Sequence, residues 1–78
     1  MNEFACRLRQ LRERRRISRK VVSELCGLSK NMIARYERGE TEPSVGAVVQ
    51  IADFFEVSAD YILGRENFRA PHIWGVAL

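Results

Sequence analysis

The chain has 78 residues, of which 46% are hydrophobic and 29% are charged. A chain of this size forms one small domain with a thin core, and its composition excludes collagen-like and low-complexity proteins. The net charge of +3 hides an asymmetry, because residues 1–39 hold 11 Lys or Arg against 4 Asp or Glu, whereas residues 40–78 hold 2 against 6. Such an imbalance predicts a surface built for a polyanion.

Membrane insertion, metal binding and disulfide formation are not expected. No apolar run approaches the roughly 20 residues of a membrane span, and residues 1–10 lack the apolar core of a secretory signal. Cys6 and Cys26 are expected to be reduced thiols in a cytoplasmic protein, with Cys26 as an inert core residue. His72 is the one histidine, so no metal site is expected. No catalytic or cofactor-binding constellation points to an enzyme.

Apolar spacing predicts five short helices in chain order and no strand. The first helix covers residues 3–15, where apolar residues recur at helical spacing between many arginines. The later helices are each expected to begin at a serine, a common N-cap residue: Ser18, Ser29, Ser44 and Ser58. Glycines are expected to end three of them: Gly27, Gly39 and Gly64.

The third segment, from Ser29 to Arg38, has two chemically distinct faces when about 100° is allowed per residue. The apolar face, which can pack on the other helices, consists of Met32, Ile33 and Tyr36. The opposite face consists of Lys30, Asn31, Ala34, Arg35 and Arg38. Lys and Arg suit the acceptors of guanine, Asn suits adenine, and a small alanine permits close approach to a major groove. This face predicts DNA recognition, unless it is only a solvated basic surface.

A tight turn joins the second and third segments. Gly27, Leu28 and Ser29 form this connection, and a helix, a short turn with a glycine and a second helix are typical of a helix-turn-helix. With these residues, the chain resembles the lambda-repressor/Cro-type helix-turn-helix domain of the xenobiotic-response-element (XRE) class. The resemblance covers about residues 4–64 and is most specific in IARYERGETEPS and IADFFEVSADYILG.

The resemblance implies an all-α fold and a function. It implies a compact five-helix bundle in residues 1–64, followed by a tail over residues 65–78. It also implies a sequence-specific transcriptional regulator, expected to be a repressor that binds an inverted repeat in double-stranded DNA as a homodimer. The third helix would lie in the major groove.

The resemblance also implies individual roles. Base contacts are expected for Lys30, Asn31, Met32 and Arg35, although Met32 could instead pack against the protein. Phosphate contacts are expected for Arg19, Ser29, Arg38 and the loop from Gly39 to Thr41. Glu37 is expected to form a structural pair with Arg12.

Four positions depart from the family pattern. Arg19 replaces a frequent Gln and can still reach a phosphate, and Ser23 replaces a frequent Ala and could bond back to a helix carbonyl. The family frequently has Gly at the position of Arg16, and Gly or Asn at the position of Glu56. If those two sites need positive φ, each costs on the order of 1 kcal/mol.

Several apolar residues are candidates for an interface. Those expected at a dimer contact are Phe54, Tyr61, Ile73 and Trp74, although Phe54 could instead be partly buried under the tail. An alternative function is an antitoxin-like interaction module that binds a toxin protein through residues 69–78. Asp53, Glu56 and Asp60 occupy helical surface positions and are expected to form a solvated acidic face.

Overall fold

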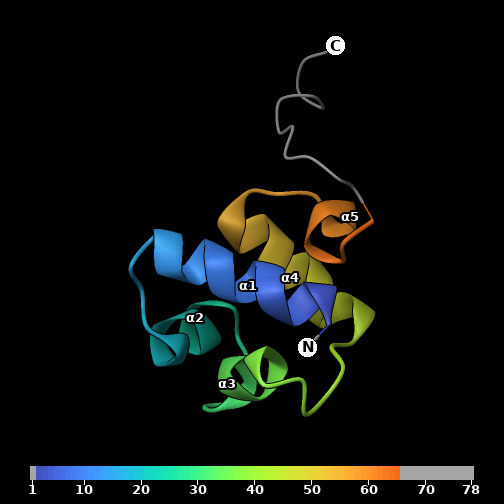
Figure 1. Cartoon of the computed structure of the whole chain (residues 1–78). Helices are drawn as coiled ribbons and strands as arrows, with labels where there is room; N and C mark the ends of the chain where they lie inside the picture. Colours follow the sequence, from blue (N-terminus) through green and yellow to red (C-terminus); the bar gives the residue numbers. More distant parts are fainter. Residues whose placement is uncertain (1, 66–78) are drawn as a thin grey trace.

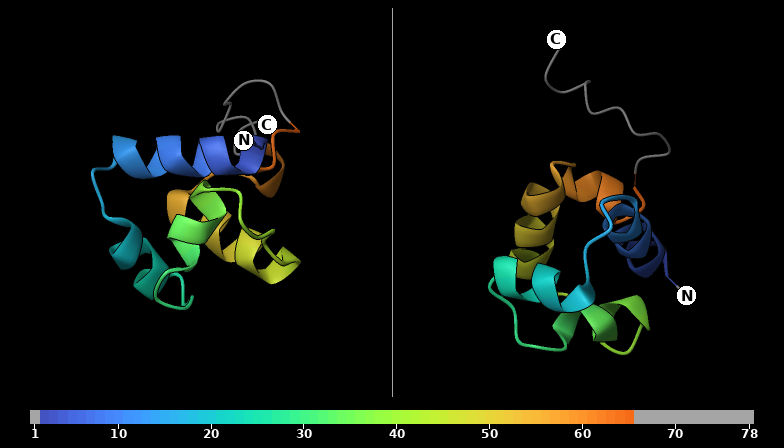
Figure 2. Two further views of the ribbon diagram at one scale, coloured as in Figure 1. Left: turned by 60° about the horizontal axis from the view of Figure 1, so that its bottom comes forward. Right: turned by 90° about the vertical axis from the view of Figure 1, so that its left-hand side faces the viewer.

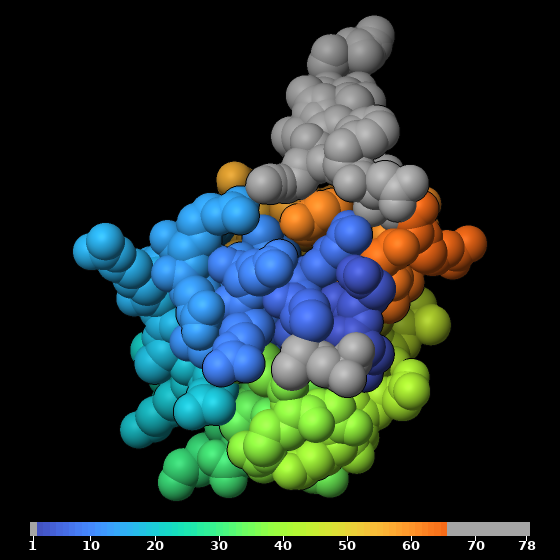
Figure 3. All heavy atoms as spheres, viewed as in Figure 1, coloured from blue at the N-terminus to red at the C-terminus, as the bar shows by residue number. Residues whose placement is uncertain are grey.

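The structure, a computed structural model, describes residues 2–65, and these form five helices (Figures 1 and 2). The helices are α1 (Glu3–Arg14), α2 (Arg19–Leu25), α3 (Met32–Glu37), α4 (Val45–Phe55) and α5 (Ala59–Ile62). In Figure 1, α1 crosses the middle of the molecule, with α2 and α3 below it and α5 above it. The space-filling view in Figure 3 shows α1 covering the centre of this face. The predicted all-helical fold is confirmed.

Short polar side chains fix where four of the helices begin. Ser18 Oγ accepts a hydrogen bond from the Val21 N–H at 3.1 Å, and Ser44 and Ser58 make the same bond to the residue three positions later. Asn2 plays this part for α1. Each bond satisfies one of the backbone donors that a helix leaves open at its start. The predicted starts at these three serines are therefore confirmed.

The predicted start of the third helix at Ser29 is wrong. Helix α3 begins at Met32, so Lys30 lies in the preceding turn, and Asn31 stands at the cap position without a side-chain capping bond. The Ser29 carbonyl accepts from the Met32 N–H at 3.1 Å, while its side chain is exposed and caps nothing. The donor near the start of α3 is satisfied from another helix, as described below.

Residues from every helix build one core. The apolar face of α1, with Phe4, Leu8 and Leu11, packs against α3 and α5, and the ring of Phe4 meets that of Tyr36 edge to face at 5.6 Å. Ile33 is fully buried, so the predicted apolar face of α3 packs inward as expected. Cys26 is also buried, and burial raises the pKa of its thiol, which therefore stays protonated at neutral pH.

Arg7 in α1 and Arg15, the residue that follows this helix, both contact neighbouring helices. Arg7 Nη1 donates to the Tyr61 carbonyl at 2.8 Å, and its guanidinium lies 4.5 Å from the centre of the Tyr61 ring. Arg15 donates to the carbonyls of Phe54 and Phe55 at 3.3 and 3.0 Å. These carbonyls lie at the ends of α4 and α5, where cations are favoured. Both arginines therefore tie α1 to neighbouring helices.

Positive φ occurs at two residues other than glycine, Arg16 with φ 57° and Glu56 with φ 58°. Arg16 ends the turn after α1, and Glu56 is the left-handed residue that closes α4. The sequence left open whether these two positions need positive φ, and both have it, so the condition of that prediction is met. A side chain with a Cβ is strained in this region by about 1–2 kcal/mol.

Candidate nucleic-acid interface

The turn between α2 and α3 is set by backbone hydrogen bonds around one glycine. The Leu28 N–H donates to the Ser23 carbonyl at 2.8 Å, and the Gly27 N–H donates to the Glu24 carbonyl at 3.1 Å. This pair of bonds is a Schellman motif, which needs a left-handed residue at its centre. Gly27 has φ 72° and open space around it, so its backbone conformation alone explains the glycine. The motif fixes the direction in which the chain leaves α2.

A buried serine joins the two helices of the motif. Ser23 is 1% exposed, and its Oγ accepts from the Ile33 N–H at 3.2 Å. This bond from α2 supplies the cap that α3 lacks from its own preceding residues. The sequence suggested that the Ser23 hydroxyl could bond back to a carbonyl of its own helix, but its hydroxyl oxygen instead accepts a hydrogen bond from α3. The only signal in the sequence was a serine at a position where the family often has alanine.

A charged pair anchors the other end of α3. Arg12 Nε lies 2.6 Å from Glu37 Oε2, and Arg12 Nη2 lies 3.2 Å from Glu37 Oε1, which makes the contact bidentate. The same guanidinium donates to the Ile17 carbonyl at 3.0 Å. Glu37 is 4% exposed, and its hydrogen bond raises the pKa of Arg12 further above its ordinary value. The pair therefore holds α3 against α1, in the geometry that the resemblance implied.

The exposed face of the motif gathers basic and polar side chains from the start of α2 and from the turn before α3. A shallow depression is lined by Ser18, Arg19, Lys20, Lys30, Asn31 and Ala34. Arg19 comes from the first turn of α2, and Lys30 and Asn31 from the turn that leads into α3. Ala34 is half-buried, and the other five residues are exposed. The small side chain of Ala34 thus lies at the base of the depression, between longer side chains.

Predicted base-contacting residues thus fall into two groups. Lys30, Asn31 and Arg35 are exposed and available to a ligand. Met32 is half-buried and packs against the hydrophobic core. At least part of the Met32 side chain therefore packs against the protein, which is the alternative to a base contact.

The loop after α3 contains an acidic residue among the predicted phosphate contacts. Arg38 Nε lies 2.6 Å from Glu40 Oε2, Arg38 Nη2 lies 3.2 Å from Glu40 Oε1, and Arg35 Nε lies 3.9 Å from the same carboxylate. The hydrogen bond from Arg38 lowers the pKa of Glu40, which is therefore ionised at neutral pH. Gly39 has φ 73° and is exposed, while Thr41 is half-buried. Sequence reasoning missed the part played by Glu40.

The candidates for a dimer contact differ in accessibility. Phe54 is half-buried, and its ring stands edge to face with that of Phe55 at 4.9 Å. Tyr61 is 9% exposed and lies beneath Arg7, so it is a core residue that offers little surface to a partner. Ile73 and Trp74 lie outside the described residues.

Within residues 2–65, no helix is long and apolar enough to span a bilayer. The same part of the chain brings no three His, Cys, Asp or Glu side chains into an arrangement that could hold a metal ion.

The fold and the α2–turn–α3 unit define the class of lambda-repressor-like helix-turn-helix DNA-binding domains. The chain belongs to the helix-turn-helix domain family, whose model matches residues 3–62.

Relatives and solved structures agree with this assignment. The chain is 38% identical over 61 residues to the HTH-type transcriptional regulator AnsR of Bacillus subtilis (strain 168), covering 78% of this chain and 53% of AnsR. It is 36% identical over 70 residues to the HTH-type transcriptional regulator YobD of the same organism, covering 90% of this chain and 62% of YobD. The chain thus spans only about half to three-fifths of these two relatives.

Two solved structures are similar across most of the chain. The P22 c2 repressor protein in complex with a synthetic operator matches with a TM-score of 0.77 and 26% identity, covering 85% of this chain and 100% of that one. The restriction-modification controller protein C.AhdI from Aeromonas hydrophila matches with a TM-score of 0.72 and 25% identity, covering 77% of this chain and 91% of that one.

Proposed function

We propose that residues 1–64 bind double-stranded DNA in a sequence-specific way and that the protein regulates transcription, acting as a repressor. The observation that carries this proposal is the convergence of Arg19, Lys30 and Asn31 on one depression, beside the exposed Arg35. Cationic donors with a carboxamide between them match phosphates and the acceptor edges of purines. The similarity to the P22 c2 repressor bound to a synthetic operator supports the same function.

In this proposal, α3 and the turn before it enter the major groove. Lys30 and Asn31 face base edges from the turn before α3, and Arg35 does so from the exposed side of this short helix, whose other side is buried. Met32 can contribute only the part of its side chain that the core leaves open. Arg12 and Glu37 do not touch DNA but hold α3 at a fixed angle.

Phosphates would be held on both sides of this helix. Arg19 reaches one strand from the first turn of α2, and Arg38 with the loop from Gly39 to Thr41 reaches the other, with Ser29 at the turn. Arg38 is already paired with Glu40, so a phosphate must replace that carboxylate to gain the full contact. Glu40 therefore weakens non-specific attraction to DNA, and base contacts gain relative weight.

A homodimer on an inverted repeat would place two α3 helices about 34–36 Å apart, one turn of DNA. Two candidates for the dimer contact, Phe54 and Tyr61, are among the described residues. Phe54, in the last turn of α4, is the one that keeps accessible surface. Protection of a symmetric site by the purified protein, and silencing of a reporter that carries this site in its promoter, test the dimer and the repressor role. An asymmetric single half-site would contradict the dimer, and increased reporter expression would contradict the repressor role.

The DNA-binding proposal is tested by selecting a site from random duplexes and measuring anisotropy at about 150 mM salt. We expect Arg35→Ala to weaken binding to the selected site by about 1–3 kcal/mol and to relax one base position. Arg19→Ala should weaken all sequences alike and reduce the salt slope by about 1. Arg65→Ala is the matched control, because Arg65 comes shortly after α5 in the chain, and α5 lies on the other side of α1 from α3 (Figure 1).

Two outcomes would overturn this proposal. One is equal affinity for the selected site and for random duplex. The other is an equal loss on every sequence for both Arg35→Ala and Arg19→Ala, since that would remove the division between base and phosphate contacts.

A further inference from the structure

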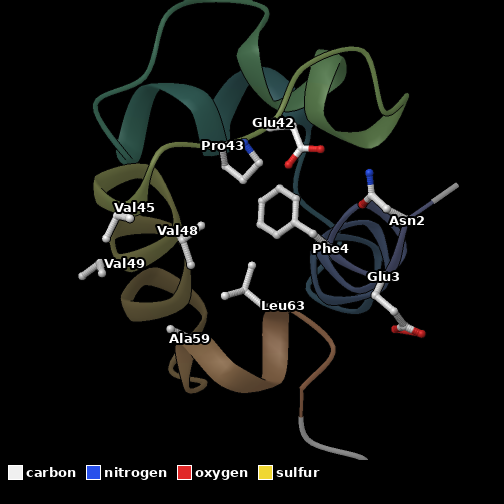
Figure 4. Close-up of a pocket in the computed structure, with 10 residues that line it drawn as sticks. All are labelled: Asn2, Glu3, Phe4, Glu42, Pro43, Val45, Val48, Val49, Ala59 and Leu63. Atoms are coloured by element: carbon white, nitrogen blue, oxygen red, sulfur yellow. The ribbon is translucent and has the colours of Figure 1, made fainter.

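An apolar groove lies away from the turn between α2 and α3, between the start of α1, the start of α4 and the end of α5 (Figure 4). Its volume is about 400 Å³, within the range of pockets that accept whole small molecules. The apolar side chains that line it are Phe4, Val45, Val48, Val49, Ala59 and Leu63. The proposed DNA contacts do not use any of these residues.

The groove exposes apolar surface that the rest of the described chain does not cover. Val45 is 81% exposed, Val49 is 45% exposed and Leu63 is 36% exposed. Burial of such surface is favourable at about 25 cal/mol per Å². Adjacent exposed apolar residues around a hollow are typical of an interaction site, unlike single scattered ones.

The last residues that the structure describes lie at the rim of this groove. Gly64 packs so closely on Glu3 that a Cβ built on the glycine would lie 2.5 Å from Glu3 Cβ. Glu3 and Leu63 both line the groove. Arg65, the last described residue, is therefore only two positions from a lining residue.

Residues 66–78 carry a segment whose chemistry matches the groove. Ile73, Trp74, Val76 and Leu78 supply large apolar side chains, and Arg69 and His72 precede them. Ile73 lies eight positions after Arg65, and eight extended residues reach about 26 Å. This reach lets the apolar segment fold back along the groove from its Leu63 end.

The rim of the groove complements the charge of that segment. Glu3 in α1 and Glu42 in the loop before α4 both line the groove (Figure 4). Glu3 also pairs with Arg7 at 3.1 Å, whereas Glu42 forms no hydrogen bond or ion pair with another residue of 2–65. Arg69 brings a positive charge next to the apolar segment, and His72 adds a second when it is protonated.

We propose that residues 69–78 dock into this groove of their own chain, with Trp74 as the main anchor. A tryptophan side chain buries about 150–250 Å² and dominates contacts of this kind. The short connection from Arg65 gives the segment a millimolar effective concentration at the groove, so a second molecule competes poorly. Docking of this segment does not depend on DNA binding.

Trp74 is the only tryptophan of the chain, so its fluorescence reports docking directly. In the full chain we expect blue-shifted emission and protection from acrylamide quenching. Val49→Lys, which places a cation in the groove, should shift the emission to longer wavelength and remove the protection. Leu25→Lys is the matched control, because Leu25 is 64% exposed on α2 and does not line the groove. Val45→Gln provides a second groove variant without added charge.

The following outcomes decide the proposal, with far-UV circular dichroism confirming that each variant is folded. Emission of a fully solvated indole in the unsubstituted chain would overturn it, as would equal emission from the Val49→Lys and Leu25→Lys chains. Blue-shifted emission that disappears on dilution, together with dissociation of a dimer in sedimentation, would assign the segment to the groove of a second copy and refute docking within one chain. Emission that is independent of concentration supports the proposal.

Discussion

The substitution Glu56→Gly tests whether backbone strain at the end of α4 is real. Glu56 closes this helix with φ 58° and ψ 43°, a left-handed conformation that disfavours a side chain with a Cβ. Its side chain is 84% exposed, and its ion contact is to Arg15 at 3.9 Å. A surface contact at this distance contributes little, so the substitution loses almost nothing from the folded state.

The expected gain follows from two opposing effects. Removing the Cβ relieves about 1–2 kcal/mol of strain. Glycine also gains freedom in the unfolded chain, which costs about 0.4–1 kcal/mol. We therefore expect Glu56→Gly to raise the free energy of unfolding by about 0.5–1 kcal/mol. For a domain of this size, the melting temperature should rise by roughly 2–8 °C.

Urea and thermal unfolding followed by circular dichroism measure this change. Glu56→Ala is the control, because alanine removes the carboxylate and keeps the Cβ in the same backbone conformation. The alanine variant should be no more stable than the unsubstituted chain. If both variants stabilise the protein equally, the effect comes from the charge, and the strain argument is wrong.

Three further experiments test contacts around α3. Glu37→Gln should lower the free energy of unfolding by about 3 kcal/mol, because it leaves the Arg12 charge poorly compensated; adding Arg12→Met should recover part of this loss. If the losses of unfolding free energy in the Glu37→Gln and Arg12→Met single variants simply add in the double variant, the two residues are not coupled and this prediction is wrong. Ser23→Ala should cost about 1–3 kcal/mol in urea unfolding, because the buried Ile33 N–H loses its acceptor; an unchanged midpoint would refute this cap. Glu40→Gln should raise affinity for every duplex in anisotropy titrations severalfold, because the carboxylate no longer competes with phosphate; unchanged affinity would contradict this competition.

Sequence reasoning succeeded where a feature depends on neighbouring residues. The starts of α2, α4 and α5 follow from Ser18, Ser44 and Ser58, because each hydroxyl bonds to a backbone N–H three residues later. Positive φ at Arg16 and Glu56 is raised as a condition by the resemblance to a family that often has Gly, or Gly and Asn, at these positions, and both residues have it. Local hydrogen bonds and backbone sterics depend on a few neighbouring residues, so a short stretch of sequence can predict them.

The start of α3 could not be found in this way. Ser29 has the right residue type for a cap, yet the helix begins three residues later and takes its cap from Ser23 on another helix. The position of Lys30 and Asn31 changes with it, from helix to turn. A cap that comes from ten residues away depends on how α2 crosses α3, which no local pattern contains.

Residue types and their spacing predict the five helices, their order and the basic face of the third, and the motifs of the chain indicate its family. Which charges are available to a ligand depends on tertiary contacts. Arg7 and Arg15 donate hydrogen bonds to carbonyls at the ends of other helices, and Arg38 pairs with Glu40. Arg19 remains exposed. A charge count treats these arginines alike, because their differences arise only from partners that folding brings close.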